Sequence, residues 1–512
     1  MIEENKSSMK NSVRRIIIAG IGVLIQIIWV VVLLMRLNEY SQIITLLTVA
    51  IVLVLVLAVY SMDTNAAFKL PWIILITVAP IVGICVFFLF GRSGATKKVR
   101  ARYRKIDQQL FAYLDQDEQI IEELSKKDER LANDFKYLWK CASSPVYKNT
   151  DVKYYGDTCD AMAAQLEDMM QAKKFIFLEY HAIEMAESFQ ALRKVLMAKA
   201  REGVEIRILY DDAGCIGFLN PRFIKYMESM GIQCRVFNPI MPVLNIFMNN
   251  RDHRKITVID GKVAYTGGYN LADEYFNITH PYGQWKDSGI RFEGDAVQTA
   301  TILFLEMWNA LREQDVDIEK YLPVYPYKAK EQGFFALYGD SPLDKEPAGE
   351  NVYMNLLRHA KKYIYFTTPY LILSDEMTRE LTGAAKRGVD VRIITPGIPD
   401  KKTIFQVTKS YYPQLLKHGV KIYEYTPGFM HEKQCICDGE IVVVGTINLD
   451  FRSLYLHFEN AALFCGYEAV SHVKEDFDAL FPICKDMSKE PSERTRRLRL
   501  SQLILRLFSP LM

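Results

Sequence analysis

The chain has 512 residues and half of them are hydrophobic, so it is long enough for several domains with large buried cores. Lysine and arginine exceed aspartate and glutamate by two (63 against 61), which gives no global indication of a nucleic-acid or an acidic partner. Nine scattered cysteines without a Cys-x-x-Cys pair argue against a disulfide framework and a zinc site.

Three apolar segments occupy the region 1–92. They cover residues 16–34, 43–60 and 72–90, and each approaches the ~20 residues that a helix needs to cross a bilayer. Three such segments without an evident cleavage site predict transmembrane helices rather than a signal peptide or buried soluble helices.

The orientation in the membrane follows from basic residues. Such clusters precede the first segment and follow the third, and both favour the cytoplasm. Three full crossings cannot satisfy both clusters, so either one segment is re-entrant or interfacial, or the N-terminus lies outside. We expect a multi-pass protein of the cell membrane whose catalytic region faces the cytoplasm.

Residues 93–150 are charged and helical in pattern, and they are expected to connect the membrane segments to two similar halves at 151–325 and 351–485. KKFIFLEY in the first half resembles KKYIYFTT in the second, and REGVEIRILYD resembles KRGVDVRIITP. Strands that alternate with helices predict an α/β sheet in each half, and a long repeat that occurs twice indicates domain duplication. The proline-, tyrosine- and charge-rich residues 326–350 are expected to be a linker.

Each half contains the pattern His-x-Lys-x-x-x-x-Asp, as HRKITVID and as HEKQCICD, and a glycine turn with an asparagine follows. The two copies supply His253, Lys255, Asp260 and Asn270, and His431, Lys433, Asp438 and Asn448. Two matches with matching downstream residues indicate a duplicated catalytic half-site.

The residue types in this pattern suit phosphate chemistry. Residues i and i+2 of a strand share a face, so each histidine is expected to project into the site beside its lysine. That pairing is poor for a metal cation but suits a phosphate, because the ammonium neutralises the anion while the imidazole acts as nucleophile or acid. Two half-sites together let one imidazole attack phosphorus while the other protonates the leaving alkoxide, without a metal or other cofactor.

Each imidazole also needs a partner that fixes its tautomer, usually a carboxylate. Asp287 in WKDSG and Glu459 in HFEN follow the two motifs at similar offsets and are the candidates, with surface ion pairs as the alternative. Asn270 and Asn448 either hold the phosphate or are ordinary turn residues. The other histidines, His181 included, are interpreted as ordinary, although the loop of His280 could bring it near the site.

The C-terminal segment, residues 486–512, combines arginines with leucines, Ile504 and Phe508. This pattern predicts a basic amphipathic helix for an anionic lipid surface. The alternative is a terminal helix docked on the enzyme, and the three apolar segments favour the membrane interpretation.

The duplicated motif is similar to the signature of the phospholipase D superfamily. The blocks HRKITVIDGKVAYTGGYNLADEY, GQWKDSGIRFEG and GTINLDFRSLYLHFEN, the apolar N-terminal segments and the ending RLFSPLM resemble bacterial cardiolipin synthases of that type. The resemblance implies two phospholipase D-like α/β sandwich halves in a pseudo-twofold arrangement, preceded by N-terminal transmembrane helices. It also implies a membrane phosphatidyltransferase that makes cardiolipin and glycerol from two phosphatidylglycerol molecules.

The same resemblance implies roles for the motif residues. His253 would form the phosphohistidine intermediate and His431 would be the general acid and then the base. The groups that would hold the phosphate are Lys255, Lys433, Asn270 and Asn448. In the family the orienting carboxylate can come from the other half, so Glu459 would serve His253 and Asp287 would serve His431. Asp260 and Asp438 belong to the motif and are expected to anchor the turn after each strand.

The sequence departs from the family pattern near these positions. Gly268 and Thr446 stand where many members have serine, and His457 stands where asparagine is common. Cys435 and Cys437 replace aliphatic or small residues in the second motif. None of these changes affects the defining His, Lys and Asp positions.

Other functions compete with lipid transfer. A phospholipase D that hydrolyses lipids or exchanges their headgroups differs only in whether water or an alcohol reaches the intermediate, and phosphatidylethanolamine is an alternative second substrate. A nuclease of the superfamily is disfavoured by the near-neutral charge and the apolar segments. An inactive membrane scaffold is disfavoured because both motif histidines are intact.

Overall fold

Seven strands of the first half form one mixed sheet in the order β1-β9-β7-β6-β2-β3-β4. Its strands are β1 (Thr150–Tyr155), β2 (Phe175–Tyr180), β3 (Glu205–Asp211), β4 (Gln233–Phe237), β6 (Ile256–Ile259), β7 (Val263–Gly267) and β9 (Gly289–Gly294). β2, β3 and β4 run parallel, and β2 is buried along its whole length, as its apolar run requires. The helices of this half are α8 (Thr158–Met170), α9 (Glu187–Arg201), α10 (Asp212–Cys215), α11 (Phe223–Glu228) and α12 (Val297–Leu311).

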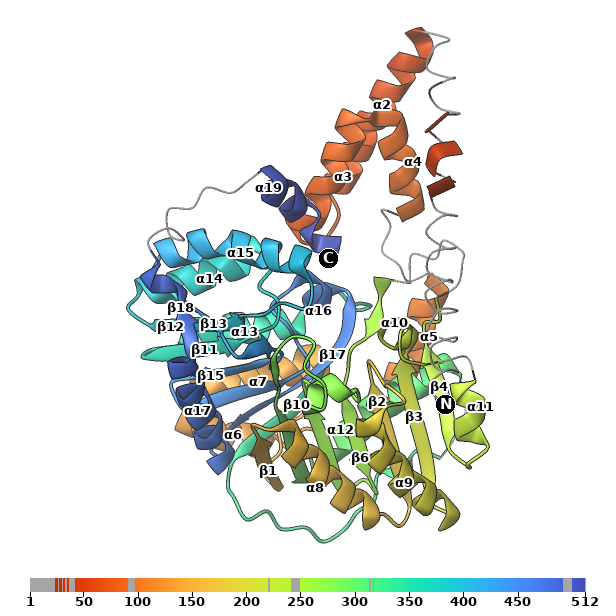
Figure 1. The fold of residues 1–512 in the computed structure, drawn as a ribbon, viewed down its shortest axis with the longest axis vertical. Coiled ribbons are helices and arrows are strands. Elements are labelled where there is room, and N and C mark those ends of the chain that lie inside the picture. The colour runs from red at the N-terminus through yellow and green to blue at the C-terminus, as the bar shows by residue number, and fades with distance from the viewer. Residues whose placement is uncertain are drawn as a thin grey trace.

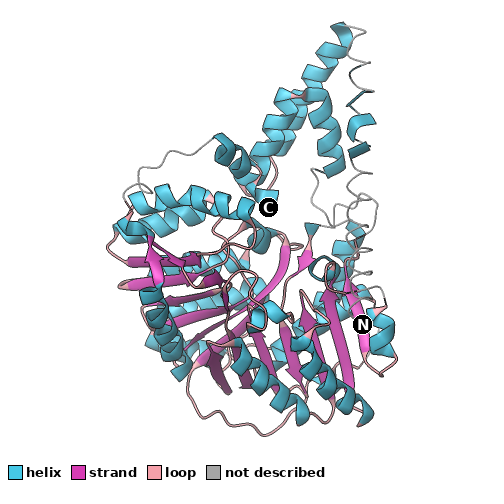
Figure 2. Cartoon of the chain, viewed as in Figure 1, coloured by secondary structure: helices cyan, strands magenta, loops and turns pink. Residues whose placement is uncertain are grey.

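The second half repeats this strand order in the sheet β10-β17-β16-β15-β11-β12-β13-β18. Its strands are β10 (Phe334–Asp340), β11 (Tyr363–Thr367), β12 (Asp390–Pro396), β13 (Lys421–Tyr425), β15 (Gln434–Cys437), β16 (Ile441–Gly445), β17 (His457–Cys465) and β18 (Cys484–Asp486). Its helices are α13 (Ala348–His359), α14 (Asp375–Lys386), α15 (Lys402–Lys417), α16 (Phe451–Tyr455) and α17 (Glu468–Leu480). The predicted α/β fold with two similar halves is confirmed, and the two sheets lie together with helices around them (Figure 2).

The computed structural model describes most of the chain. The described residues are 24–25, 27–29, 31–32, 35, 42–90, 97–219, 222–240, 249–312, 315, 317–490 and 500–511. The predicted apolar segment at residues 16–34 lies largely outside these ranges.

Two short strands cross between the halves. β5 (Arg251–Asp252) pairs in parallel with the start of β17, and β8 (Gln284–Lys286) pairs in parallel with β14 (Gly428–Met430). β5 directly precedes His253 and β14 directly precedes His431, and each of these strands pairs with a strand of the other half. This reciprocal pairing relates the halves by a pseudo-twofold arrangement.

Apolar packing joins the halves as well. α12 is buried on nearly all sides, and its buried polar residues Glu306 and Asn309 are paired with Arg254 and Asp315. The rings of Phe292 and Phe335 lie 4.9 Å apart across the junction, and Phe335 stacks on Phe464 at 6.2 Å. One cluster of buried apolar residues therefore runs through both halves.

The connector and the predicted linker are both integral to this body. The connector forms α5 (Lys97–Leu110), α6 (Glu118–Lys127) and α7 (Glu129–Ala142), and Tyr103 of α5 stacks on Phe458 at 5.3 Å. Residues 326–350 differ from the expected linker, because they contain β10, which pairs with β17, and the start of α13. The buried residues of FFALYGD explain why this stretch is a strand.

The N-terminal helices project from the body that the two α/β halves form (Figure 1). They are α2 (Gln42–Tyr60), α3 (Ala66–Val78) and α4 (Pro80–Phe90). The apolar segment at 72–90 does not form the single helix that was expected. Helix α3 ends at its C-cap Ala79, directly before Pro80, and α4 folds back and packs against α3. Gly83 permits this contact, since a Cβ there would lie 2.5 Å from the carbonyl oxygen of Leu75. Within the described ranges, no helix combines the length and the apolarity that a membrane crossing requires.

The C-terminal helix α19 (Leu500–Leu507) is docked on α15 and α3. Its Arg506 lies over the ring of Tyr411 at 4.0 Å. Leu503 and Ile504 are about half exposed, so the helix also presents an apolar face to its surroundings. The arginines that precede it lie outside the described residues.

Candidate active site

The two motif histidines lie where the chain crosses between the halves. The backbone N–H of His253 donates to the carbonyl of Phe458 (2.9 Å), and that of His431 donates to the carbonyl of Lys286 (2.8 Å). Each His-x-Lys triplet therefore precedes its strand, β6 or β15, and does not lie on it as expected. At His253 and His431 the backbone is hydrogen-bonded to the other half instead of to the sheet of its own half.

Both histidines line a single cavity of about 660 Å³ that is built from the two halves. Asn270 and Asn448 line it too, so the structure brings both copies of the motif to one site. The side chain of Asn270 donates to the hydroxyl of Tyr275 (2.8 Å) and accepts from the backbone of Ala182 (3.1 Å). The Oδ1 of Asn448 is buried and has no hydrogen-bond partner among the described residues.

The two motif lysines are buried beside the histidines. Lys255 Nζ donates to the carbonyl of His253 (2.7 Å), and Lys433 Nζ donates to the carbonyl of His431. Two ammonium groups behind two imidazoles make the local field positive, which suits an anionic phosphodiester.

The orienting carboxylates cross between the halves. Nδ1 of His253 lies 2.9 Å from both carboxylate oxygens of Glu459, and Nδ1 of His431 lies 2.6 Å from Oδ2 of Asp287. Both carboxylate side chains are fully buried. A carboxylate that accepts from Nδ1–H leaves Nε2 unprotonated, and this is the tautomer that a nucleophile or base requires.

The two departures at the serine positions have different consequences. The hydroxyl of Thr446 donates to Glu459 and accepts from the backbone N–H of Asn460 (3.0 Å), so it supplies the polar group that a serine would. Gly268 supplies none. A Cβ at Gly268 would lie 2.1 Å from Oδ1 of Asp287, so this carboxylate fills the space that a serine side chain would take.

The surroundings of His253 are polar. The rings of His181 and His457 lie 5.0 and 5.5 Å from its ring. His181 Nδ1 donates to the carbonyl of Asp252 (2.7 Å), and Arg452 Nε lies 3.4 Å from Nε2 of His457. His181 was not selected from the sequence, although its place directly after the parallel strand β2 is one where α/β proteins often place functional residues. His280 is exposed and is not among the residues that line the cavity.

The surroundings of His431 are aromatic instead. Its ring lies 5.2 Å from Tyr275, 5.1 Å from Trp285 and 5.8 Å from Phe429. The two half-sites share the contact between imidazole and carboxylate, but they differ in their neighbours, and only in the second does the lysine (Lys433 Nζ) also lie 2.8 Å from the histidine Nδ1. These differences fit two histidines with different tasks.

Burial and positive charge set the protonation of the site. Burial, together with Lys255 and Lys433, holds the pKa of both histidines well below the ordinary value. Burial also lowers the pKa of Lys255 to about 8 and that of Lys433 to about 7, although carboxylates nearby oppose the shift. Burial raises the pKa of Asp287 to about 6 against the effect of Lys433. At neutral pH both imidazoles are therefore neutral, and the Asp287 carboxylate beside His431 is ionised.

The motif aspartates bind backbone away from the cavity. Asp260 accepts from the N–H groups of Lys173, Lys174 and Phe175 at 2.7–2.9 Å. Asp438 accepts from the corresponding N–H groups of Lys361, Lys362 and Tyr363 at 2.7–2.8 Å. Both have positive φ (53° and 54°), so each fastens a left-handed turn to the start of the neighbouring strand.

One cluster near the site has the ligand types of a metal centre. Potential ligand atoms of His253, His457 and Glu459 lie within 4.8 Å of one another. Glu459 already accepts from His253 Nδ1, and Lys255 adds positive charge close by. The donor set is therefore a poor fit for a cation.

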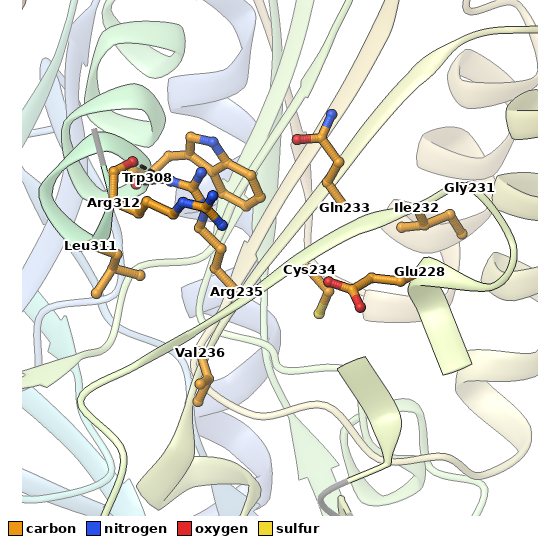
Figure 3. Close-up of a pocket in the computed structure, with 10 residues that line it drawn as sticks. All are labelled: Glu228, Gly231, Ile232, Gln233, Cys234, Arg235, Val236, Trp308, Leu311 and Arg312. Carbon is orange, nitrogen blue, oxygen red and sulfur yellow. Dashed lines mark hydrogen bonds between the residues drawn. The ribbon is translucent and has the colours of Figure 1, made fainter. Parts of the chain in front are cut away.

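Another cleft, of about 450 Å³, lies along β4 and the end of α12 (Figure 3). The guanidinium of Arg235 lies over Trp308 at 3.9 Å and donates to the carbonyls of Trp308 and Arg312. None of the motif residues lines this cleft.

The duplicated motif on two joined α/β halves defines a protein of the phospholipase D class. The family model described as "Cardiolipin synthase, PLD-like domain" matches residues 166–308 and 353–481, and the chain belongs to this family. An uncharacterized protein of Streptococcus mutans is 39% identical over 90% of this chain and 99% of its own length. A cardiolipin synthase of Halalkalibacterium halodurans is 32% identical over 86% of this chain and 87% of its own length.

A solved structure resembles the fold. The phosphatidylserine synthase of Haemophilus influenzae Rd KW20 superimposes with a TM-score of 0.53 at 14% identity, over 71% of this chain and 95% of that one. At this identity the likeness concerns the fold alone.

Proposed function

We propose that this chain is a membrane phosphatidyltransferase that makes cardiolipin and glycerol from two molecules of phosphatidylglycerol. The observation that carries the proposal is the shared cavity, in which His253 and His431 are each held by a carboxylate of the other half. The names of the related cardiolipin synthases support the substrate class.

The first step forms a covalent intermediate. Nε2 of His253 attacks phosphorus, a P–N bond forms, and the P–O bond to the departing glycerol breaks. His431 gives a proton from Nε2 to the departing oxygen. Lys255, Lys433 and the two asparagine amides hold the phosphate oxygens. Glu459 stabilises the charge that develops on the imidazole of His253 while it carries the phosphatidyl group.

The second step returns His253 to its free form. His431, now neutral, takes the proton from a glycerol hydroxyl of the second phosphatidylglycerol. That oxygen attacks phosphorus, and the P–N bond breaks. The bound phosphate anion offsets the repulsion from the lysines, which raises the pKa of His431 and allows it to carry the proton between the two steps.

The membrane part of the proposal rests on the ends of the chain. The apolar helices α2 to α4 and the exposed apolar face of α19 would hold the cavity near lipids whose acyl chains stay in the bilayer. Basic residues of α5 would place the catalytic body on the cytoplasmic side.

The test is a product assay. Membranes that carry the protein are given labelled phosphatidylglycerol, and the lipid products are separated. Label in cardiolipin with release of free glycerol is the expected result, also in the presence of a chelator. Phosphatidic acid alone would mean a hydrolytic phospholipase D, and an absence of product would contradict an enzymatic role. His253→Ala is the inactive control.

A further inference from the structure

An apolar groove of about 430 Å³ lies between the N-terminal helices and the C-terminal end. Ile74 and Val78 of α3, Val86 of α4, and Leu507 and Phe508 line it. Several of these side chains are exposed at the rim, Ile74 by 42%, Val78 by 79% and Phe508 by 46%. Contiguous exposed apolar side chains of this kind mark a binding surface.

The groove is fixed to the catalytic body. Phe68 of α3 packs edge-on against Phe451 and Tyr455 of α16, at 5.6 and 5.5 Å. Asn65 at the start of α3 donates to the hydroxyl of Tyr455 and to Glu376, both at 3.1 Å. The position of α3 relative to the second half is therefore set by specific contacts.

The groove lies next to the catalytic cavity, because α3, which lines the groove, packs on α16, which lines the cavity. Phe451 and Tyr455 of α16 face α3, whereas Arg452 of the same helix lines the cavity. Asn249 lines the groove, and Arg251, two residues later, lines the cavity. One short helix and one short stretch of chain thus separate an apolar site from the histidines.

We propose that this groove binds an acyl chain of the phospholipid whose phosphate lies between His253 and His431. The inference rests on the proposed function, since it assigns the two ends of one amphiphilic substrate to two adjoining sites. The two buried lysines beside the histidines suit the phosphate. The apolar groove suits the acyl chain, and binding of the chain would also cover the exposed apolar side chains at the rim. The groove would align the phosphorus with His253 as well as hold the lipid.

The first test is a crosslink that requires no turnover. The full chain in phosphatidylcholine vesicles is given phosphatidylglycerol with a photoreactive diazirine near the end of one acyl chain, and adducts are mapped by mass spectrometry. Adducts on Ile74, Val78 and Phe508 are expected, and excess unlabelled phosphatidylglycerol should suppress them while added phosphatidylcholine should not. Equal suppression by both lipids would assign the groove to bulk lipid, and no adduct would mean that another part of the chain covers it. Either result overturns the proposal.

Matched variants give the second test. Ile74→Trp narrows the groove, whereas Leu70→Trp adds the same ring to an exposed position of α3 that does not line it. We expect Ile74→Trp to lower the adduct yield about tenfold, the usual consequence of overpacking, and Leu70→Trp to leave it unchanged. Equal effects of the two variants would contradict the proposal. Phe508→Ala removes a side chain that lines the groove and should lower the adduct yield. Leu503→Ala changes a residue that does not line the groove and should leave the yield unchanged.

Activity separates this inference from the proposed function. Ile74→Trp should slow transfer from long-chain phosphatidylglycerol but leave transfer from a dihexanoyl analogue unchanged, because six carbons are too short to fill the groove. A protein that crosslinks as expected but forms no cardiolipin would refute the proposed reaction and keep the acyl site. A protein that forms cardiolipin at the wild-type rate in both variants would refute the acyl site alone.

Discussion

The imidazole of His253 is held by Glu459, a residue 206 positions later in the chain and in the other half of the molecule. The mirror relationship joins His431 to Asp287. Because each imidazole is hydrogen-bonded to a carboxylate of the opposite half, neither half contains both members of such a pair. The two copies of the motif therefore work together, in halves that are joined by paired strands and by a common cluster of buried apolar residues.

The first prediction concerns this crossed pair. Glu459→Gln should lower the rate of intermediate formation by about a hundredfold or more, because a neutral amide does not stabilise the charge on a phosphorylated imidazole. The amide NH2 can also donate to Nδ1, which favours the wrong tautomer of His253. Quenched-flow measurement of labelled phosphatidyl-enzyme gives this rate. Glu424→Gln is a matched control, since Glu424 is also buried in the second half but pairs with Lys409 and does not line the cavity. A Glu459→Gln enzyme as fast as the control would contradict the orienting role.

The second prediction uses the glycine that stands in place of a serine. Gly268→Ser should cost most of the activity, because its Cβ would displace the Asp287 carboxylate that orients His431. Gly217→Ala is the control, since Gly217 lines the same cavity but its Cβ would have nothing within 4 Å. Initial rates of cardiolipin formation compare the two variants. Full activity in Gly268→Ser would show that Asp287 can shift without consequence.

The hydroxyl of Thr446 provides the third prediction. Thr446→Ser keeps the hydrogen bond to Glu459 and should retain activity. Thr446→Val keeps the shape but leaves a buried carboxylate without this donor, so kcat should fall about tenfold. The measurement is kcat for each variant under saturating lipid. Equal rates for Ser and Val would mean that the hydroxyl plays no part in holding Glu459.

Much of the site could be predicted from the sequence because its signals are local. The spacing of the motif marks both histidines that line the shared cavity, and the offset of WKDSG and HFEN marks both carboxylates that lie against them. The hydrogen bonds of Asp260 likewise agree with the expectation of a turn anchor.

What could not be predicted depends on long-range contacts. The β10 strand is recognisable only through its pairing with β17, which lies more than a hundred residues later. Pro80 marks the end of α3 at its C-cap Ala79, but the return of α4 onto α3 depends on packing at Gly83, which hydropathy does not record. His181 reaches the site only because β2 lies beside β6 in the sheet, and no spacing in the sequence marks it.

The fourth prediction separates structure from chemistry in the motif. Asp260→Ala removes three hydrogen bonds to backbone N–H groups and should lower the free energy of unfolding by about 2 kcal/mol or more. The chemistry of the folded fraction should persist, because Asp260 does not line the cavity. Thermal denaturation and the rate per active site, titrated by burst, measure the two effects. A stable protein without activity would instead place Asp260 in the catalytic machinery.

The fifth prediction is a pH dependence that the buried lysines impose. An ammonium is charged below its pKa, so a phosphodiester is held most tightly below pH about 7, where both lysines are protonated. As pH rises, Lys433 loses its proton around pH 7 and Lys255 around pH 8, so kcat/KM for phosphatidylglycerol should decline through this range. Because the pKa of His253 is held well below its ordinary value, this nucleophile stays neutral and no loss of kcat/KM is expected as the pH falls from 7 to 6.

Steady-state rates at constant ionic strength between pH 6 and 9.5 give this profile. Lys433→Arg is informative, since a guanidinium stays charged throughout and should remove the first descent even if its different shape lowers the overall rate. A profile that stays flat to pH 9.5 in the wild-type enzyme would mean that neither lysine needs its proton to hold the substrate. A profile that rises with pH would mean that deprotonation of an imidazole, rather than the charge of the lysines, limits the free enzyme.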